Sequence, residues 1–234
     1  MQGQLPQLWT FCFYALIVWA MSAVLVAFRL LAQNEGVATG LRVGALVWLG
    51  LPALLASLGA FQNFDARPPV LMRVLLPMVV LIVAFVISPW GKTAAQRLPL
   101  SLLVGTQLFR LPLEILLYGL SLRGFLPREM TMAGFNYDIV TGVAAGSFWF
   151  FMRRGPVPQW SIWIWNVFGF LALLAVVTIA VLSFPQPFGL FFPPNEIVAY
   201  YPWVWLPTFL VQVALVSHLL VFRKLLAQPD PLWQ

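Results

Sequence analysis

The stretch "LPLSLLVGTQLFRLPLEILLYGLSL", residues 98–122, decides the fold, because it is long and apolar enough to cross a bilayer as a helix. Such a helix needs about 20 largely apolar residues. The stretch nevertheless contains Arg110 and Glu114, and a charge at the centre of a membrane helix costs at least about 2.5–3.5 kcal/mol. We therefore expect a bundle of membrane-spanning helices in which this charged face turns toward other helices or a wet cavity.

Polar side chains recur at helical spacing along this stretch and form one stripe on its predicted helix. They are Gln107, Arg110, Glu114 and Tyr118. Pro112 lies between the two charges and cannot donate a backbone hydrogen bond, so the helix should kink there and free the carbonyl of Leu108. The guanidinium of Arg110, which has five N–H donors, is a candidate partner for that carbonyl.

Two interpretations of the charges remain open. Arg110 and Glu114 lie one helical turn apart, so they could neutralise each other as a static ion pair that ties helices together. Alternatively, they could form a site for an ion or small polar molecule, because intramembrane charge is expensive to keep without a function.

The composition excludes an ordinary soluble domain. Of the 234 residues, 62% are hydrophobic and only 9% are charged, whereas soluble domains carry about 25% charged residues. The net charge of +6 is not gathered into a basic stripe, so we expect no nucleic-acid partner and a lipid bilayer instead. Cys12 is the single cysteine, which excludes an intrachain disulfide and a cysteine metal site.

Seven apolar stretches are predicted to span the membrane, so residues 1–234 should form one all-α bundle domain without a soluble domain. The stretches are 8–29, 43–61, 72–90, 98–122, 136–152, 160–183 and 201–222.

Basic residues are unequally divided between the two predicted sides. Eight follow spans one, three, five and seven: Arg29, Arg42, Lys92, Arg97, Arg153, Arg154, Arg223 and Lys224. Four lie on the other side: Arg67, Arg73, Arg123 and Arg128. Because basic loops stay in the cytoplasm, the pattern predicts an external N-terminus and an internal C-terminus.

Polar residues outside the fourth span add candidates to the site. Asn136 and Asp138 begin the fifth span, where an acid favours the helix dipole. Alternatively, Asp138 joins Glu114, and two neighbouring carboxylates would share a proton or bind a cation.

His218 is the single histidine and lies inside the last span. One histidine without a nearby second ligand is weak evidence for a metal, so we expect no metal site and no cofactor. An interhelical hydrogen bond is the simpler role, and a relay through Asn166 and Arg110 is the alternative. Gln212 could also join helices. Gly142 and Gly146 have the small-xxx-small spacing that lets helices approach closely.

Two segments resemble a family of uncharacterised bacterial multi-pass membrane proteins: residues 109–142, "FRLPLEILLYGLSLRGFLPREMTMAGFNYDIVTG", and 183–225. The shared features are Arg110 and Glu114; Pro127, Met130 and Thr131; Asn136 and Asp138; Pro185, Pro187 and Phe188; Pro194 and Asn195; Trp205, Leu206 and Pro207; and His218. The family pattern has Glu–Gly–Arg–Asn–Phe–Asp where this chain has "AGFNYD", residues 133–138. The resemblance implies a multi-pass protein of the bacterial cytoplasmic membrane and assigns no activity.

Three functions follow from these residues. The first is a protein that binds or moves a small ion or polar solute, and its predicted binding residues are Arg110, Glu114, Asp138, Asn136, Gln107, Tyr118, Asn166 and His218. The second is a structural or sensory partner that uses the charges for helix association. The third is a membrane-embedded enzyme acting on a lipid-like substrate, so enzymatic activity stays an open question. Protein partners or self-association remain open as well.

Overall fold

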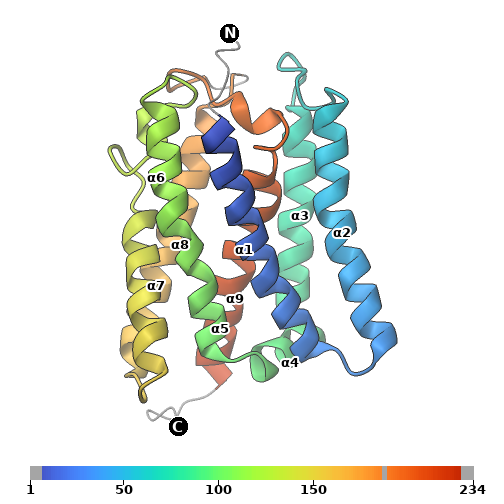
Figure 1. The fold of residues 1–234 in the computed structure, drawn as a ribbon, viewed down its shortest axis with the longest axis vertical. Coiled ribbons are helices and arrows are strands. Elements are labelled where there is room, and N and C mark those ends of the chain that lie inside the picture. Colours follow the sequence, from blue (N-terminus) through green and yellow to red (C-terminus); the bar gives the residue numbers. More distant parts are fainter. Residues whose placement is uncertain (1–6, 186–188, 228–234) are drawn as a thin grey trace.

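Long apolar helices run side by side through the protein, whose computed structural model describes residues 7–185 and 189–227 (Figure 1). Among these residues, six helical units are long and apolar enough to cross a membrane. They are α1 (Gln7–Leu31), α2 (Glu35–Ser57), α3 (Val70–Ile87), the unit Leu100–Ser121, α8 (Gln159–Leu182) and the unit Leu206–Ala227. The structure confirms an all-α bundle with several candidate membrane spans.

The fifth predicted span, 136–152, is shorter in the structure. α7 (Asp138–Met152) has 15 residues, which at 1.5 Å per residue cover about 22 Å. That length is less than the roughly 30 Å of a bilayer's hydrocarbon core. α7 packs against the unit Leu100–Ser121 and occupies only the lower part of the bundle in Figure 1.

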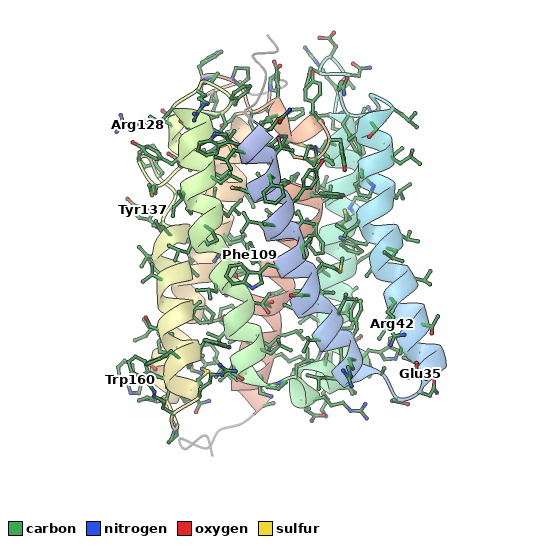
Figure 2. The ribbon with its side chains drawn as sticks, viewed as in Figure 1. Glu35, Arg42, Phe109, Arg128, Tyr137 and Trp160 are labelled. Carbon is green, nitrogen blue, oxygen red and sulfur yellow. The ribbon has the colours of Figure 1, made fainter. Side chains whose placement is uncertain are left out.

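The connection before α7 runs along the part of the bundle's length that the short helix α7 does not cover. It contains only a short 3₁₀ turn, η2 (Arg128–Met130). Figure 2 places Arg128 near the upper end of the bundle and Tyr137 well below it. Irregular backbone is tolerated at membrane depth only where protein or a cavity surrounds it, so this connection is a structural part of the bundle.

The second span begins earlier than its predicted start at residue 43. α2 starts at Glu35, and its first turn is capped by Asn34, whose Oδ1 accepts a hydrogen bond from the amide of Val37 at 2.9 Å. Arg42 was assigned to the loop after the first span, but both Arg42 and Glu35 belong to α2. They occupy the lower end of the helix (Figure 2).

The connection after the third span is also helical. α4 (Pro89–Arg97) follows α3 after Ser88, whose hydroxyl accepts from the amide of Gly91 at 3.3 Å. Lys224 donates to the carbonyl of Ala95 at 2.8 Å and to that of Leu98 at 3.0 Å. Lys224 was counted among the basic residues that follow the last span; it is buried and its ammonium group holds the end of α4.

The last helical unit is the centre of the bundle. It consists of a π-helical turn, η4 (Leu206–Leu210), and α9 (Val211–Ala227). α3, α4, α5 (Leu100–Thr106) and α8 pack against α9. α1 packs against α2, α5 and α6 (Arg110–Ser121), so the N-terminal helices lie on the outside of this centre.

Candidate functional site

The fourth span is interrupted at the stripe of polar residues. A 3₁₀ turn, η1 (Gln107–Phe109), separates α5 from α6, which begins at Arg110. Gln107, Arg110 and Glu114 are each at most 1% exposed. The prediction that this face turns into the bundle is therefore confirmed for these three residues. Tyr118 is half-buried, and the described contacts do not connect it with them.

Arg110 joins three helices through its guanidinium. Nη2 lies 3.1 Å from Oδ2 of Asp138, at the start of α7. The two groups therefore form a buried ion pair. Nη1 donates to the carbonyl of Gly169 on α8 at 3.2 Å and to Nε2 of His218 on α9 at 3.1 Å.

These contacts correct two expectations about Arg110. Its ion-pair partner is Asp138 rather than Glu114, because α7 brings an acid against the guanidinium from a different helix. The side chain of Arg110 also donates to the carbonyl of Gly169 and not to the carbonyl of Leu108.

His218 and Asn166 extend the network across α8 and α9. Nδ1 of His218 lies 2.8 Å from Oδ1 of Asn166, while Nδ2 of Asn166 donates to the backbone carbonyl of His218 at 3.2 Å. A guanidinium can only donate, so Nε2 of His218 accepts from Arg110 and carries no proton. Nδ1 then carries the proton and donates to Asn166, which makes the imidazole neutral. The interhelical hydrogen bond expected of His218 is confirmed, and both residues of the alternative relay, Asn166 and Arg110, contact its ring.

Asn136 connects the carboxylate of Glu114 with the backbone at the start of α7. Its Nδ2 donates to Oε1 of Glu114 at 2.6 Å and to the carbonyl of Met130 at 3.0 Å. Its Oδ1 accepts from the backbone amide of Asp138 at 3.0 Å. Asp138 was expected either to cap α7 or to join Glu114. It lies in the first turn of α7, and its side chain forms the ion pair with Arg110.

Two glutamines complete the polar centre on the α9 side. Gln107 donates from Nε2 to the carbonyl of Ala214 at 3.0 Å. Gln212 donates from Nε2 to the carbonyl of Pro207 at 3.0 Å, within the same helical unit. Gln107 therefore joins two helices. Gln212 was expected to join helices, but the hydrogen bond of its amide nitrogen stays within its own helical unit, at the π-helical turn.

Close helix contacts around the site depend on glycines. A Cβ at Gly142 would lie 2.7 Å from the backbone nitrogen of Leu111, and one at Gly146 would lie 2.8 Å from a methyl of Leu108. The predicted packing role of this pair is confirmed. Gly169, which the sequence did not single out, would place a Cβ 2.7 Å from Cε1 of His218.

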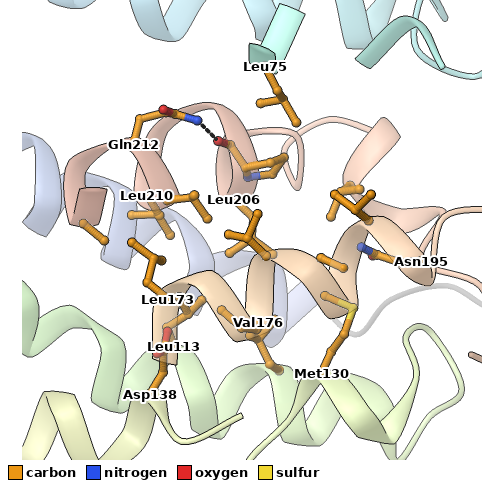
Figure 3. Close-up of a pocket in the computed structure, with 18 of the residues that line it drawn as sticks. Leu75, Leu113, Met130, Asp138, Leu173, Val176, Asn195, Leu206, Leu210 and Gln212 are labelled. Atoms are coloured by element: carbon orange, nitrogen blue, oxygen red, sulfur yellow. Dashed lines mark hydrogen bonds between the residues drawn. The ribbon is translucent and has the colours of Figure 1, made fainter. Parts of the chain in front are cut away.

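A cavity of about 290 Å³ borders the polar network. Figure 3 shows its apolar wall, to which Leu75 of α3, Leu113 of α6, Val176 of α8 and Leu210 of η4 contribute. Asp138 lies at one end of this wall in Figure 3, and Arg110, Glu114 and Gln212 also border the cavity.

The cavity is open at its side. Leu76 on α3 borders it and is 64% exposed, and Val177 on α8 borders it and is half-buried. Both residues belong to candidate membrane spans. In a bilayer, the opening between α3 and α8 therefore faces lipid.

Several polar atoms at the cavity wall receive no hydrogen bond from the described protein. They are Oε2 of Glu114, Oδ1 of Asp138, Oδ1 of Asn195, Oε1 of Gln212 and Nη2 of Arg110, of which the last lies in the ion pair with Asp138. All five residues are at most 5% exposed. An unsatisfied buried polar group costs about 1–3 kcal/mol, and more when it is charged, so these atoms are the candidates in this site for contact with a ligand.

Sequence comparison places the chain in a family. Residues 68–226 match the family described as Domain of unknown function (DUF8737). The match covers more than half of the chain, so the protein belongs to this family. It includes the network from Gln107 to His218 and extends beyond the two segments on which the resemblance was based. Of those segments, Pro187 and Phe188 lie outside the described residues. No curated protein and no solved structure matches the chain.

Proposed function

We propose that this member of the DUF8737 family binds a small ion or a molecule with a compact polar group at the site formed by Arg110, Glu114 and Asp138. One observation carries the proposal. Oε2 of Glu114 is buried at the wall of the cavity and receives no hydrogen bond from the described protein. A cation, a proton or a donor group of a ligand would satisfy it.

The surroundings of Glu114 support binding over simple helix association. Asn136 holds Oε1 at 2.6 Å, which fixes the carboxylate and leaves its second oxygen available. Arg110 is engaged by Asp138, His218 and the carbonyl of Gly169. Glu114 is therefore not needed to neutralise Arg110, and it is the acid of the network that is available to a ligand.

Charge displacement on a supported membrane tests the proposal. Proteoliposomes adsorbed to a sensor would be exposed to jumps in proton, Na⁺ or methylammonium concentration. We expect at least one of these to displace charge with the unmodified protein. Glu114→Gln should abolish the signal because it keeps the shape of the side chain and removes its charge. Glu196→Gln, at an exposed position, should retain it. An unchanged signal in Glu114→Gln would refute the proposal.

Movement of the ligand across the membrane is the second part of the proposed function. The network lies between α6, α7, α8 and α9, and the irregular connection before α7 supplies Asn136 at the same place. Steady flux into proteoliposomes, measured for whichever probe gives the charge signal, separates a carrier from a binding protein. A carrier should show saturable flux that Glu114→Gln removes.

A structural role is the second candidate, and the contacts of Arg110 with α7, α8 and α9 favour it. In that case the network would stabilise the bundle and Glu114 would be dispensable for any ligand signal. The third candidate, an enzyme with Glu114 or Asp138 as acid or base, would use Arg110 to hold an anionic head group. We rank it last because that guanidinium is already engaged.

We further propose that α7 crosses the membrane as a short seventh span, with the N-terminus outside and the C-terminus inside a bacterial cytoplasmic membrane. α1 begins at the upper end of the bundle and α9 ends at the lower end (Figure 1), as an odd number of crossings requires. The eight basic residues that follow spans one, three, five and seven outnumber the four on the other side, which supports assigning the lower end to the cytoplasm.

A further inference from the structure

Most of the cavity-lining polar atoms without a hydrogen bond from the described protein are oxygens. Glu114, Asp138, Asn195 and Gln212 contribute one each, and the nitrogen among these atoms, Nη2 of Arg110, lies in the ion pair with Asp138. For Gln212 the assignment follows from its amide nitrogen, which donates to the carbonyl of Pro207 at 3.0 Å. Each free oxygen can accept a hydrogen bond, so the site favours a ligand group that donates.

The balance of charges at the cavity also favours a ligand that donates hydrogen bonds. Its charged lining residues within the described chain are Arg110, Glu114 and Asp138. Arg110 is paired with Asp138 at 3.1 Å, and its other contacts go to acceptors in the protein. Because Arg110 is paired with Asp138, the carboxylate of Glu114 has no counter-charge of its own in the site when it is ionised. A positively charged donor would balance it, whereas an anionic head group would not.

The rest of the cavity is suited to a hydrocarbon chain. Its wall between Asp138 and the side opening is built from aliphatic side chains, including Leu75, Leu113 and Val176 (Figure 3). The volume of about 290 Å³ is at the lower limit of ligand pockets, which span roughly 300–1,000 Å³. This space accommodates one short chain better than the two chains of a phospholipid.

We propose that the ligand is a single-chain amphiphile with a protonated amine head group, which enters from the bilayer between α3 and α8. The ammonium group lies against Oε2 of Glu114, and the chain lies along the aliphatic wall toward Leu76. The inference rests on the proposed function, because it names the class of molecule that binds at the same site.

Ligand-dependent thermal stability in lipid nanodiscs tests the proposal with three probes: decylamine, decanoic acid and ethylamine. A ligand that binds only the folded state raises the melting temperature, and the rise grows with the logarithm of the ratio of ligand concentration to Kd once that ratio is large. Decylamine should raise the melting temperature of the unmodified protein in this concentration-dependent way, and decanoic acid should not. Glu114→Gln should weaken the binding of decylamine at least about tenfold, as expected for loss of a hydrogen bond to a charged group.

A variant at the side opening tests the route separately. Leu76→Trp should narrow the opening and weaken decylamine binding while leaving the response to ethylamine unchanged. Leu81→Trp is the matched control, because Leu81 is similarly exposed on α3 and does not border the cavity. Both positions are exposed, so these variants should fold even where Glu114→Gln does not.

The outcomes separate this inference from the proposed function. Equal binding of ethylamine and decylamine, with no effect of Leu76→Trp, would refute an amphiphile while leaving the polar site intact. Stronger binding of decanoic acid than of decylamine would refute the amine head group. No Glu114-dependent response to any probe, together with no charge displacement, would overturn both proposals.

Discussion

Arg110 and Asp138 form an ion pair whose partners are at most 5% exposed, and its value depends on both being present. Desolvation of two charges roughly offsets their attraction, so such a pair adds little net stability. Removing one partner, however, leaves the other charge buried without compensation. The network around Arg110 therefore fixes the positions of the helices relative to one another, and it adds little net stability to the fold.

Replacing Arg110 alone should destabilise the bundle strongly. We expect Arg110→Met to lower the free energy of unfolding by about 3–5 kcal/mol, because the carboxylate of Asp138 stays buried. The double variant Arg110→Met with Asp138→Leu should recover most of this loss. Denaturant unfolding in bicelles measures both. If the single change costs less than about 1 kcal/mol, the pair is not buried as described.

The proton on His218 is predicted from its contacts. At neutral pH, Nδ1 should be protonated and Nε2 should not, because Arg110 donates to Nε2 at 3.1 Å and a guanidinium cannot accept. Nitrogen-15 NMR of selectively labelled histidine distinguishes the two tautomers by their chemical shifts. Protonation at Nε2 would contradict the described orientation of the imidazole. An Asn166→Leu variant should disturb the Nδ1 resonance first.

The elements around the site were only partly predictable. Long apolar runs located six spans because hydrocarbon thickness fixes helix length. The stripe Gln107, Arg110 and Glu114 was also predictable, since helical periodicity alone puts these side chains on one face. The sequence missed α4, the π-helical turn and the early start of α2. These depend on capping residues and on tertiary partners such as Lys224, for which hydropathy gives no signal.

The pairing within the site was not predictable for a related reason. Glu114 and Asp138 were equally plausible partners of Arg110 by chemistry. Which acid pairs with Arg110 depends on where α7 begins relative to α6. The start of α7 depends in turn on the irregular connection that carries Asn136. Gly142 indicated close packing, but its contact with the backbone of Leu111 could not be assigned without the structure.

The close packing of helices at Gly169 predicts that a larger side chain there destabilises the bundle. Gly169→Ala should destabilise the bundle by about 1–3 kcal/mol, as overpacking does. Its Cβ would meet His218 at 2.7 Å and Thr141 at 2.6 Å between helices. Gly40→Ala is the control, because nothing lies within 4 Å of its Cβ. That control should be neutral or slightly stabilising. Equal stability of the two variants would show that α7, α8 and α9 are packed less closely here.

The whole molecule is organised by its two ends and one polar centre. Arg42, Glu35 and Trp160 lie toward the lower end of the bundle, and Arg128 lies toward the upper end (Figure 2). Between these ends the surface is mainly apolar, with many exposed leucine and valine side chains along the spans. A bilayer covers that surface, and the buried charges then lie far from bulk water on both sides.

Cysteine labelling tests the proposed orientation. In a Cys12→Ser background, Asp65→Cys and Gly155→Cys would report the upper and lower ends, because both positions are exposed. A membrane-impermeant thiol reagent should label Asp65→Cys in intact cells. It should label Gly155→Cys only after the membrane is opened. The reverse pattern would contradict the charge-based orientation, and labelling of both in intact cells would contradict seven crossings.

An experimental structure in lipid nanodiscs containing decylamine tests the central claim most directly. The account predicts Arg110 paired with Asp138, Glu114 turned toward the cavity, and density for an elongated molecule running from Glu114 to the opening between α3 and α8. A sealed contact without space beside Glu114, or a Glu114 side chain turned toward the lipid tails, would contradict it.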